Sequence, residues 1–121
     1  MITPKRLLGD QGEQAVAQWL IEHGFVILAR NYQTRLGEVD IIATKGEVVA
    51  FIEVKTRKSA YFPISNTITY TKQKRITRAA TSFILKNKIQ NRVLRFDVAA
   101  VTNQISGAYD ISYIENAFTT R

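Results

Sequence analysis

The segment GEVDIIATKGEVVAFIEVKTRKS, residues 37–59, decides the fold because it carries two apolar runs on either side of a Lys-Gly turn. The runs predict two strands that pair as a hairpin, near 38–44 and 47–55. Asp40, Glu53 and Lys55 interrupt the runs at positions where a purely structural strand favours Val or Ile. The hairpin therefore has to accommodate two carboxylates and an ammonium group within buried strands.

The alternation of residues predicts which of them share a face of the hairpin. An even-numbered loop that pairs Ala43 with Val48 makes one face wholly apolar, with Val39, Ile41, Ala43, Val48, Ala50, Ile52 and Val54. The opposite face then carries Glu38, Asp40, Ile42, Val49, Phe51, Glu53 and Lys55. An odd loop would scatter charges over both faces, which burial disfavours. In the even register Asp40 is expected to lie diagonal to Glu53, within roughly 7–8 Å, with Glu38 opposite Glu53.

The rest of the chain reads as helices and strands around this hairpin. A first helix over 5–23 has an apolar stripe of Leu8, Ala15, Val16, Trp19 and Leu20. A strand is expected near 25–34, before the hairpin, and a loop over 56–70 after it. The chain then continues with a helix over 71–89 and a strand over 92–101, which is expected to be internal to the sheet. A weak strand over 109–114 and a polar tail follow. Asp97 is expected to pair with Arg95 or Arg57 and to stabilise the sheet. This order predicts an α/β fold in which helices flank a central mixed sheet.

Composition restricts the function classes. The 121 residues include 17 Lys plus Arg against 10 Asp plus Glu, a formal net charge of +7 that favours a polyanion such as nucleic acid. No cysteine and a single histidine exclude thiolate metal sites and cysteine–histidine catalysis. No apolar run reaches the roughly 20 residues that span a bilayer, and the first residues lack the apolar centre of a signal peptide. One cytoplasmic domain over 1–121, without membrane contact, is therefore expected.

The charged face of the hairpin has two interpretations. Closely spaced carboxylates repel one another, and a divalent cation removes that repulsion; Mg²⁺ favours one or two carboxylates together with phosphate oxygens and water. The competing interpretation is a salt-bridge cluster in which Lys55 and Arg57 neutralise Glu53, Asp40 and Glu38. The E-x-K triplet alone favours salt bridges, whereas an additional acid on the same face, Asp40, favours a metal site.

Four motifs in order, GEVDIIA, VVAFIEVKTR, TKQKRITRAA and RFDVAAV, resemble the YraN family of uncharacterised bacterial proteins. The resemblance covers most of the chain, beginning at GDQGEQAVAQWL. The hairpin also resembles the signature of the PD-(D/E)xK nuclease superfamily, which has an acid at the start of one core strand and then E/D-x-K on the next. Asp40 and Glu53-Val54-Lys55 stand at those positions. This resemblance implies a restriction-endonuclease-like α-β-β-β-α-β core, similar in fold to archaeal Holliday-junction resolvases.

The resemblance also implies roles for single residues. Asp40 and Glu53 match metal ligands, with the backbone carbonyl of Val54 as a further ligand, and Lys55 matches the catalytic lysine. Glu13 matches an acid of the first helix that completes the metal site in several superfamily members. The implied reaction is phosphodiester hydrolysis with Mg²⁺ or Mn²⁺ as the cofactor.

Basic and polar residues around the E-x-K motif are expected to bind nucleic acid, with DNA as the favoured substrate: Thr56, Arg57, Lys72, Gln73, Lys74, Arg75 and Arg78. Among them Gln73 matches a polar residue that some relatives place near the site. The competing interpretation of the helical lysines and arginines is a solvated face. Two functions therefore stay open, a metal-dependent nuclease acting on DNA, including branched or repair intermediates, and a non-catalytic nucleic-acid-binding protein. A protein-interaction domain is a third, and an exposed sheet edge would permit a homodimer.

Overall fold

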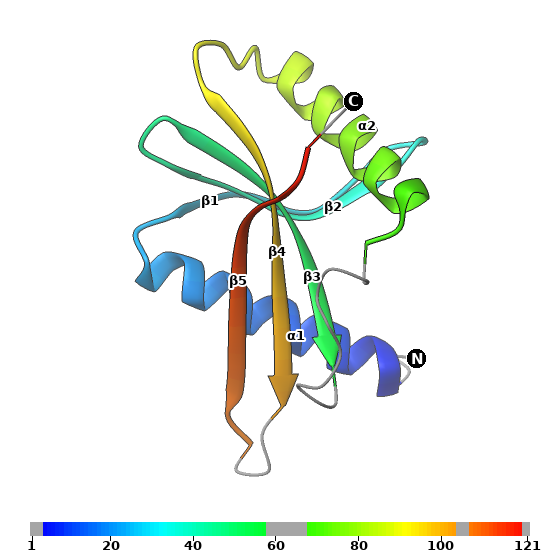
Figure 1. The fold of residues 1–121 in the computed structure, drawn as a ribbon, viewed down its shortest axis with the longest axis vertical. Helices are drawn as coiled ribbons and strands as arrows, with labels where there is room; N and C mark the ends of the chain where they lie inside the picture. The colour runs from blue at the N-terminus through cyan, green and yellow to red at the C-terminus, as the bar shows by residue number, and fades with distance from the viewer. Residues whose placement is uncertain (1–3, 58–67, 104–106, 120–121) are drawn as a thin grey trace.

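The computed structural model describes residues 4–57, 68–103 and 107–119. In the first helix it describes side chains only from Gly9 onward. Its elements are α1 (Pro4–Glu22), β1 (Val26–Gln33), β2 (Glu38–Lys45), β3 (Val48–Arg57), α2 (Tyr70–Lys86), β4 (Val93–Asn103) and β5 (Tyr109–Phe118). The five strands form one sheet in the order β1-β2-β3-β4-β5 (Figure 1). Strands β3 and β4 are parallel and the other neighbours are antiparallel. The expected mixed α/β fold is confirmed, with β5 added to the α-β-β-β-α-β core.

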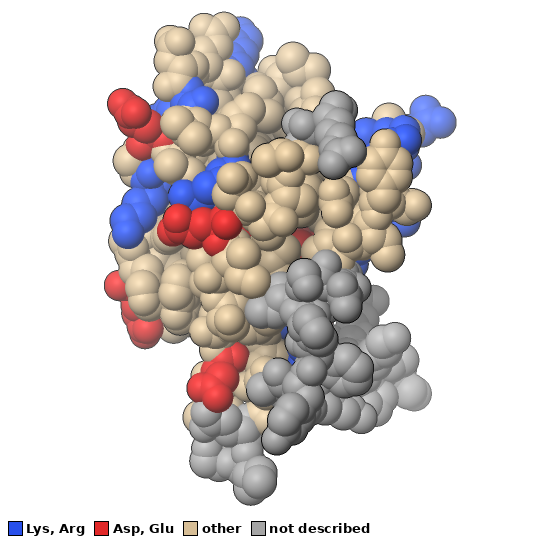
Figure 2. All heavy atoms as spheres, in the orientation of Figure 1, with Lys and Arg blue, Asp and Glu red and all other residues tan. Residues whose placement is uncertain are grey.

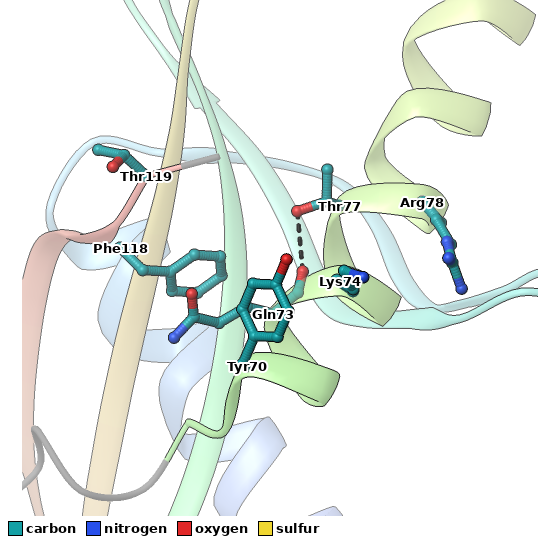
Figure 3. A pocket seen from close by; sticks show the side chains of 7 residues that line it. All are labelled: Tyr70, Gln73, Lys74, Thr77, Arg78, Phe118 and Thr119. Carbon is teal, nitrogen blue, oxygen red and sulfur yellow. Dashed lines mark hydrogen bonds between the residues drawn. The ribbon is translucent and has the colours of Figure 1, made fainter. Parts of the chain in front are cut away.

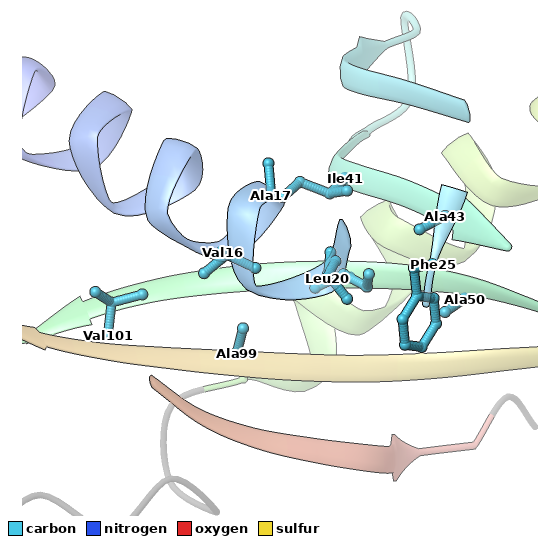
Figure 4. Packing of buried hydrophobic residues seen from close by; sticks show 10 residues of the cluster. Val16, Ala17, Leu20, Phe25, Ile41, Ala43, Ala50, Ala99 and Val101 are labelled. Carbon is cyan, nitrogen blue, oxygen red and sulfur yellow. The ribbon is translucent and has the colours of Figure 1, made fainter. Parts of the chain in front are cut away.

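The two helices cover opposite faces of the sheet, because successive residues of a strand point to opposite sides. On one face Ala50 of β3 packs with Leu20 of α1 (Figure 4), and Ile52 belongs to the same core cluster. On the other face Phe51 packs with Phe83 of α2. The predicted apolar stripe of the first helix is confirmed in its second half, because Val16 and Leu20 are fully buried and Trp19 packs against the core at its margin. Leu8, which was predicted to start the stripe, lies outside the described side chains. None of the described helices is long and apolar enough to cross a membrane.

The hairpin register differs by two residues from the prediction. Ala43 pairs with Ala50 and Lys45 with Val48, whereas Ala43 was expected opposite Val48. The cause is a loop displaced by one residue, over 46–47 instead of 45–46, because a two-residue hairpin loop needs a positive φ at its first residue and Gly46 adopts a φ of 57° without a steric penalty. A shift by two keeps each side chain on its own face, so the predicted faces hold over the paired part of the hairpin.

Two predicted neighbours at the start of β2 are wrong. Val39 packs in the core on the α2 side instead of the α1 side. Glu38 pairs with Gln33 of β1 and does not face β3. Both differences have one cause, since the backbone pairing of β2 with β3 ends at Ile41 and β2 leaves β3 at Asp40.

Two glycines bring the helices to this end of the sheet. A methyl group at Gly12 of α1 would collide with the hydroxyl of Thr56, near the end of β3. A methyl group at Gly37, in the β1–β2 turn, would collide with the backbone carbonyl of Arg75 in α2. Helix α1 therefore approaches β3 next to Glu13, and α2 approaches the start of β2.

Strand β4 is internal to the sheet, as predicted, and β5 continues to Phe118, beyond the end of the predicted weak strand. The fully buried Asp97 accepts hydrogen bonds from the side chains of Arg95 and Tyr113 and from the backbone N–H of Asn116. The predicted Arg95–Asp97 pair is confirmed. These bonds attach the second half of β5 to β4, which explains why the strand is longer than its polar sequence indicates.

Candidate active site

Asp40 and Glu53 lie together where β2 leaves β3. The Asp40 carboxylate accepts a hydrogen bond of 2.8 Å from the backbone N–H of Val54, so a side chain here replaces a backbone partner. Glu53 is only 3% exposed, and its carboxyl group is hydrogen-bonded to that of Asp40. The two acids are thus in contact and not diagonal, because the two-residue shift in register brings Asp40 level with Glu53.

Glu13 reaches the same place from α1. It is partly buried and its carboxyl group is hydrogen-bonded to that of Asp40. Asn31 of β1 faces Glu13, and its amide nitrogen, turned toward the acid, lies 3.2 Å from both carboxylate oxygens. Asn31 has a φ of 51°, a left-handed conformation that Asn tolerates better than most residues. Three carboxyl groups therefore form a series at one end of the sheet, Glu13–Asp40–Glu53.

Burial raises the pKa of all three carboxyl groups. Removal from water is the largest cause, and it raises the pKa of Asp40 to about 6, with the charge of Glu13 adding to the effect. The pKa of Glu53 is raised to about 7, again mainly by burial and then by the charge of Asp40. The pKa of Glu13 is raised as well, chiefly by burial. The carboxylates are thus short of compensating positive charge, which is the condition that a bound cation relieves.

Two lysines form ion pairs with Glu53. The Lys72 ammonium nitrogen lies 2.6 Å from Glu53 Oε1, and that of Lys55 lies 3.8 Å from the same oxygen. Burial and the neighbouring Lys72 cation lower the pKa of Lys55. Burial also disfavours the charge on Lys72, but the hydrogen bond and charge of Glu53 outweigh it, so the pKa of Lys72 is raised. A salt-bridge cluster is therefore present, with Lys72 as the closer cation.

The predicted phosphate contacts beside the E-x-K motif do not all face the acids. Thr56 faces Gly12 of α1, on the side of the sheet opposite Lys55. Gln73 donates a hydrogen bond of 3.1 Å to the carbonyl of Ile68, so its amide is turned toward the chain that precedes α2. Arg57 is partly buried at the end of β3. The structure thus separates these residues, although the sequence places them near one another.

The predicted basic residues of α2 line two hollows, with Lys72 and Arg75 in one and Lys74 and Arg78 in the other. Lys72 contacts Glu53. Arg75 lines a hollow that also contains Glu38. Lys74 and Arg78 line a different hollow, on the side of the helix that faces the end of β5. Of the four predicted cations, Lys72 is the one brought to the acids, and the others are distributed over the surface around α2.

The oxygen donors fit a hard divalent cation in their chemistry. Asp40 and Glu53 supply two carboxylates, the number that Mg²⁺ uses when phosphate oxygens and water complete its shell. Over residues 4–57, 68–103 and 107–119, no group of three or more His, Asp or Glu side chains is arranged to hold a metal ion. The residues that would hold one are thus Asp40 and Glu53. The ligand roles of Glu13 and the Val54 carbonyl stay predictions.

Sequence reasoning missed three features near the site. The direct contact of Lys72 with Glu53 leaves no trace in the local pattern, because it depends on how α2 packs against the sheet. Asn31 did carry a signal, since Asn is depleted in strands and here stands within one. Tyr70 and Phe118, which line the hollow beside Lys74, were assigned no role because one was placed in a loop and the other in a polar tail.

Comparisons with known proteins place the chain in one family. The model of the uncharacterised protein family UPF0102 matches residues 12–101, which include the hairpin and its acids. A UPF0102 protein of Caldicellulosiruptor saccharolyticus is 44% identical over 116 residues, covering 94% of this chain and 98% of its own length. One of Alkaliphilus metalliredigens is 43% identical over 112 residues, covering 92% and 96%. Another, of Dictyoglomus thermophilum, is 42% identical over 113 residues, with the same coverage of 92% and 96%. The chain therefore belongs to the uncharacterised protein family UPF0102, the family to which the YraN resemblance pointed.

Proposed function

We propose that the protein is a metal-dependent nuclease that hydrolyses phosphodiester bonds in DNA. The observation that carries the proposal is the contact of two buried carboxyl groups, Asp40 and Glu53, with two lysines next to them. Burying such groups together opposes folding, because each loses its hydration. A chain gains little from this arrangement unless the acids bind something. The PD-(D/E)xK resemblance supports the same reaction, since the acid and the E-x-K triplet occupy the corresponding strands.

Each residue of the candidate site has a proposed role in the reaction. Asp40 and Glu53 would hold Mg²⁺ or Mn²⁺, with the Val54 carbonyl as a further ligand and Glu13 hydrogen-bonded behind Asp40. A bound cation supplies Lewis acidity toward the phosphate and lowers the pKa of a water molecule. Lys55 would donate hydrogen bonds to the attacking water and to the phosphate oxygen on which charge develops. Its side chain is 26% exposed, so it can reach a substrate from its place beside Glu53.

The charge of the chain supports a nucleic acid substrate. The formal net charge is +7, and lysines and arginines lie at the edge of the molecule where α2 lies as well as along the opposite edge, where acidic residues are interspersed with them (Figure 2). Exposed cations of α2 are available for phosphate contacts: Lys74, Arg75 and Arg78. Branched or repair intermediates are the DNA class that the resemblance to resolvases favours. A symmetric cut of two strands would need a second copy, for which the unpaired edges of β1 and β5 are available.

The short ion pair supports a second candidate function, a non-catalytic nucleic-acid-binding protein. Lys72 lies 2.6 Å from Glu53 and neutralises the acid without a metal ion. A chain that keeps the fold but has no use for a cation would stabilise its buried acid in this way, since an unpaired buried charge is costly. Such a protein would bind DNA through the exposed cations of α2 and release it uncut.

A cleavage panel separates the two candidates. Duplex, single-stranded, flap and four-way-junction DNA are incubated with Mg²⁺, Mn²⁺ or EDTA and the wild type, D40N or E53Q. The matched controls are D10N and E22Q, which make the same chemical change at exposed positions of α1. The nuclease predicts metal-dependent cutting that D40N and E53Q lose and the controls keep. Salt-dependent binding by all five proteins, with no cutting under any condition, would instead establish the binding protein.

A further inference from the structure

A hollow between α2 and the end of β5 is separate from the acids of the candidate active site. Its volume is about 550 Å³, within the range of small-molecule sites. Figure 3 shows its walls: Phe118 and Thr119 come from the end of β5 and the segment after it, and the others come from the first turns of α2. The residues on the α2 side are Tyr70, Gln73, Lys74, Thr77 and Arg78.

The walls combine aromatic rings with positive charge. Tyr70 is 65% exposed, so one face of its ring is available to a ligand, and the Lys74 ammonium lies 4.8 Å from the centre of the ring. Phe118 is held in place by stacking on Phe96, with ring centres 5.0 Å apart. Arg78 adds a second cation, and none of the described residues that line the hollow carries a carboxylate. An anion that also carries a flat ring fits this combination.

The polar side chains leave acceptor groups free for the edge of such a ring. Gln73 uses its amide nitrogen to donate to the Ile68 carbonyl, so its amide oxygen can still accept. Thr77 donates its hydroxyl hydrogen to the backbone carbonyl of Gln73, 2.8 Å away, and its oxygen can likewise accept. These acceptors suit the amino groups and ring N–H groups of nucleobases.

We propose that the hollow binds one unpaired nucleotide of DNA, with its base stacked on Tyr70 and its phosphate held by Lys74 and Arg78. The inference rests on the DNA-binding part of the proposed function and deepens it, because a base that is paired and stacked in a duplex cannot enter. Lys74 follows Lys72 by two positions, about 3 Å along the helix axis. Two positions also turn the chain about 200° around that axis, so the hollow lies on a different side of α2 from Glu53, which Lys72 contacts. DNA that contains single-stranded nucleotides is therefore the preferred substrate.

The test measures binding in EDTA, so that cleavage plays no part. Fluorescence anisotropy follows a labelled oligothymidylate and a blunt duplex of equal length with the wild type, Y70A and Y70F. Because stacking on one aromatic ring contributes about 1–3 kcal/mol per base, Y70A should weaken single-strand binding about tenfold and leave duplex binding unchanged. Y70F keeps the ring and should bind as the wild type does. Tyr70 is exposed and packs little in the core, so both variants are expected to fold.

The phosphate contact is tested by the salt dependence of single-strand binding. Each phosphate contact makes the slope of log K against log salt more negative by about 0.7, so K74Q/R78Q, which removes two contacts, should make the slope less steep by about 1.4. K86Q/K88Q removes the same charge at exposed positions at the far end of α2 and should leave the slope unchanged. Equal slopes for the two double variants would overturn the phosphate contact.

The stacking role of Tyr70 would be overturned if Y70A weakened the binding of single-stranded and duplex DNA equally. It would also be overturned if Y70A bound single-stranded DNA as tightly as the wild type does. These results are distinguishable from failure of the nuclease. If no DNA is cut but binding depends on Tyr70, the nucleotide site stands and the catalytic proposal falls. If DNA is cut and binding is independent of Tyr70, the nuclease stands and the nucleotide site falls.

Discussion

The ion pair between Lys72 and Glu53 makes a quantitative prediction about cation binding. Because the Lys72 ammonium lies 2.6 Å from Glu53 Oε1, a divalent cation has to compete with it for the carboxylate. A hydrogen bond to a charged group contributes about 1.5–3 kcal/mol. The Lys72 side chain is 37% exposed, so solvent screening places the value at the lower end of that range. Since 1.4 kcal/mol is a factor of ten, K72Q should bind Mn²⁺ about tenfold more tightly than the wild type.

Isothermal titration calorimetry with Mn²⁺ measures this difference, at a pH above the pKa of Glu53, about 7, so that the carboxylates are ionised. K74Q is the matched control, because it removes the same charge from the same helix while its ammonium lies over Tyr70 and not at the acids. K74Q should bind Mn²⁺ as the wild type does. If K72Q bound Mn²⁺ no more tightly than K74Q, the competition between Lys72 and the cation would be refuted.

Three further predictions concern stability. In EDTA the raised pKa values of Asp40, about 6, and Glu53, about 7, mean that the folded state holds more protons than the unfolded state. The free energy of unfolding should therefore fall between about pH 4 and pH 8 by about 2–3 kcal/mol for each of the two acids, and D40N/E53Q should flatten the profile in urea denaturation. A rise with pH in the wild type would contradict the raised values. D97N removes the buried carboxylate from the Arg95 guanidinium, which keeps only the exposed Glu115, 3.6 Å away, and should cost about 3 kcal/mol in the same assay; a loss below about 1 kcal/mol would contradict the buried network. G37A places a methyl group against the α2 backbone and should lose about 1–3 kcal/mol. G9A has open space around it and should gain about 0.5–1 kcal/mol, so equal melting temperatures of these two variants would contradict the close approach.

The fold was predictable where local periodicity determines it. Alternation in the hairpin is a property of neighbouring residues, so the faces could be assigned before the partners were known. The partners depended on the conformation of Gly46, because its positive φ makes it the first residue of the two-residue loop, which moves the loop by one residue and shifts the register by two. The departure of β2 from β3 at Asp40 could not be predicted, since a sequence does not show where two strands stop pairing.

The candidate site was predictable to the extent that it lies on the hairpin. Asp40, Glu53 and Lys55 were expected on one face, and the structure brings them together. The contribution of Lys72 could not be assigned, because it depends on the packing of α2, which the close approach at Gly37 helps to determine. Charge along a helix indicates a partner of opposite sign, but it does not show which cation turns inward.

Single-turnover cleavage by the wild type and K55A, in Mn²⁺ and on the DNA that the wild type cuts best, tests the catalytic claim most directly. Lys55 contacts the acids without being a metal ligand, so K55A should keep the fold and bind Mn²⁺ and DNA. Removal of a group that stabilises charge developing in the transition state costs about 10²–10³ in rate, so we expect K55A to cut DNA more slowly by a factor of that size. Cleavage by K55A at the wild-type rate, or no metal-dependent cleavage by the wild type on any DNA of the panel, would contradict the catalytic claim.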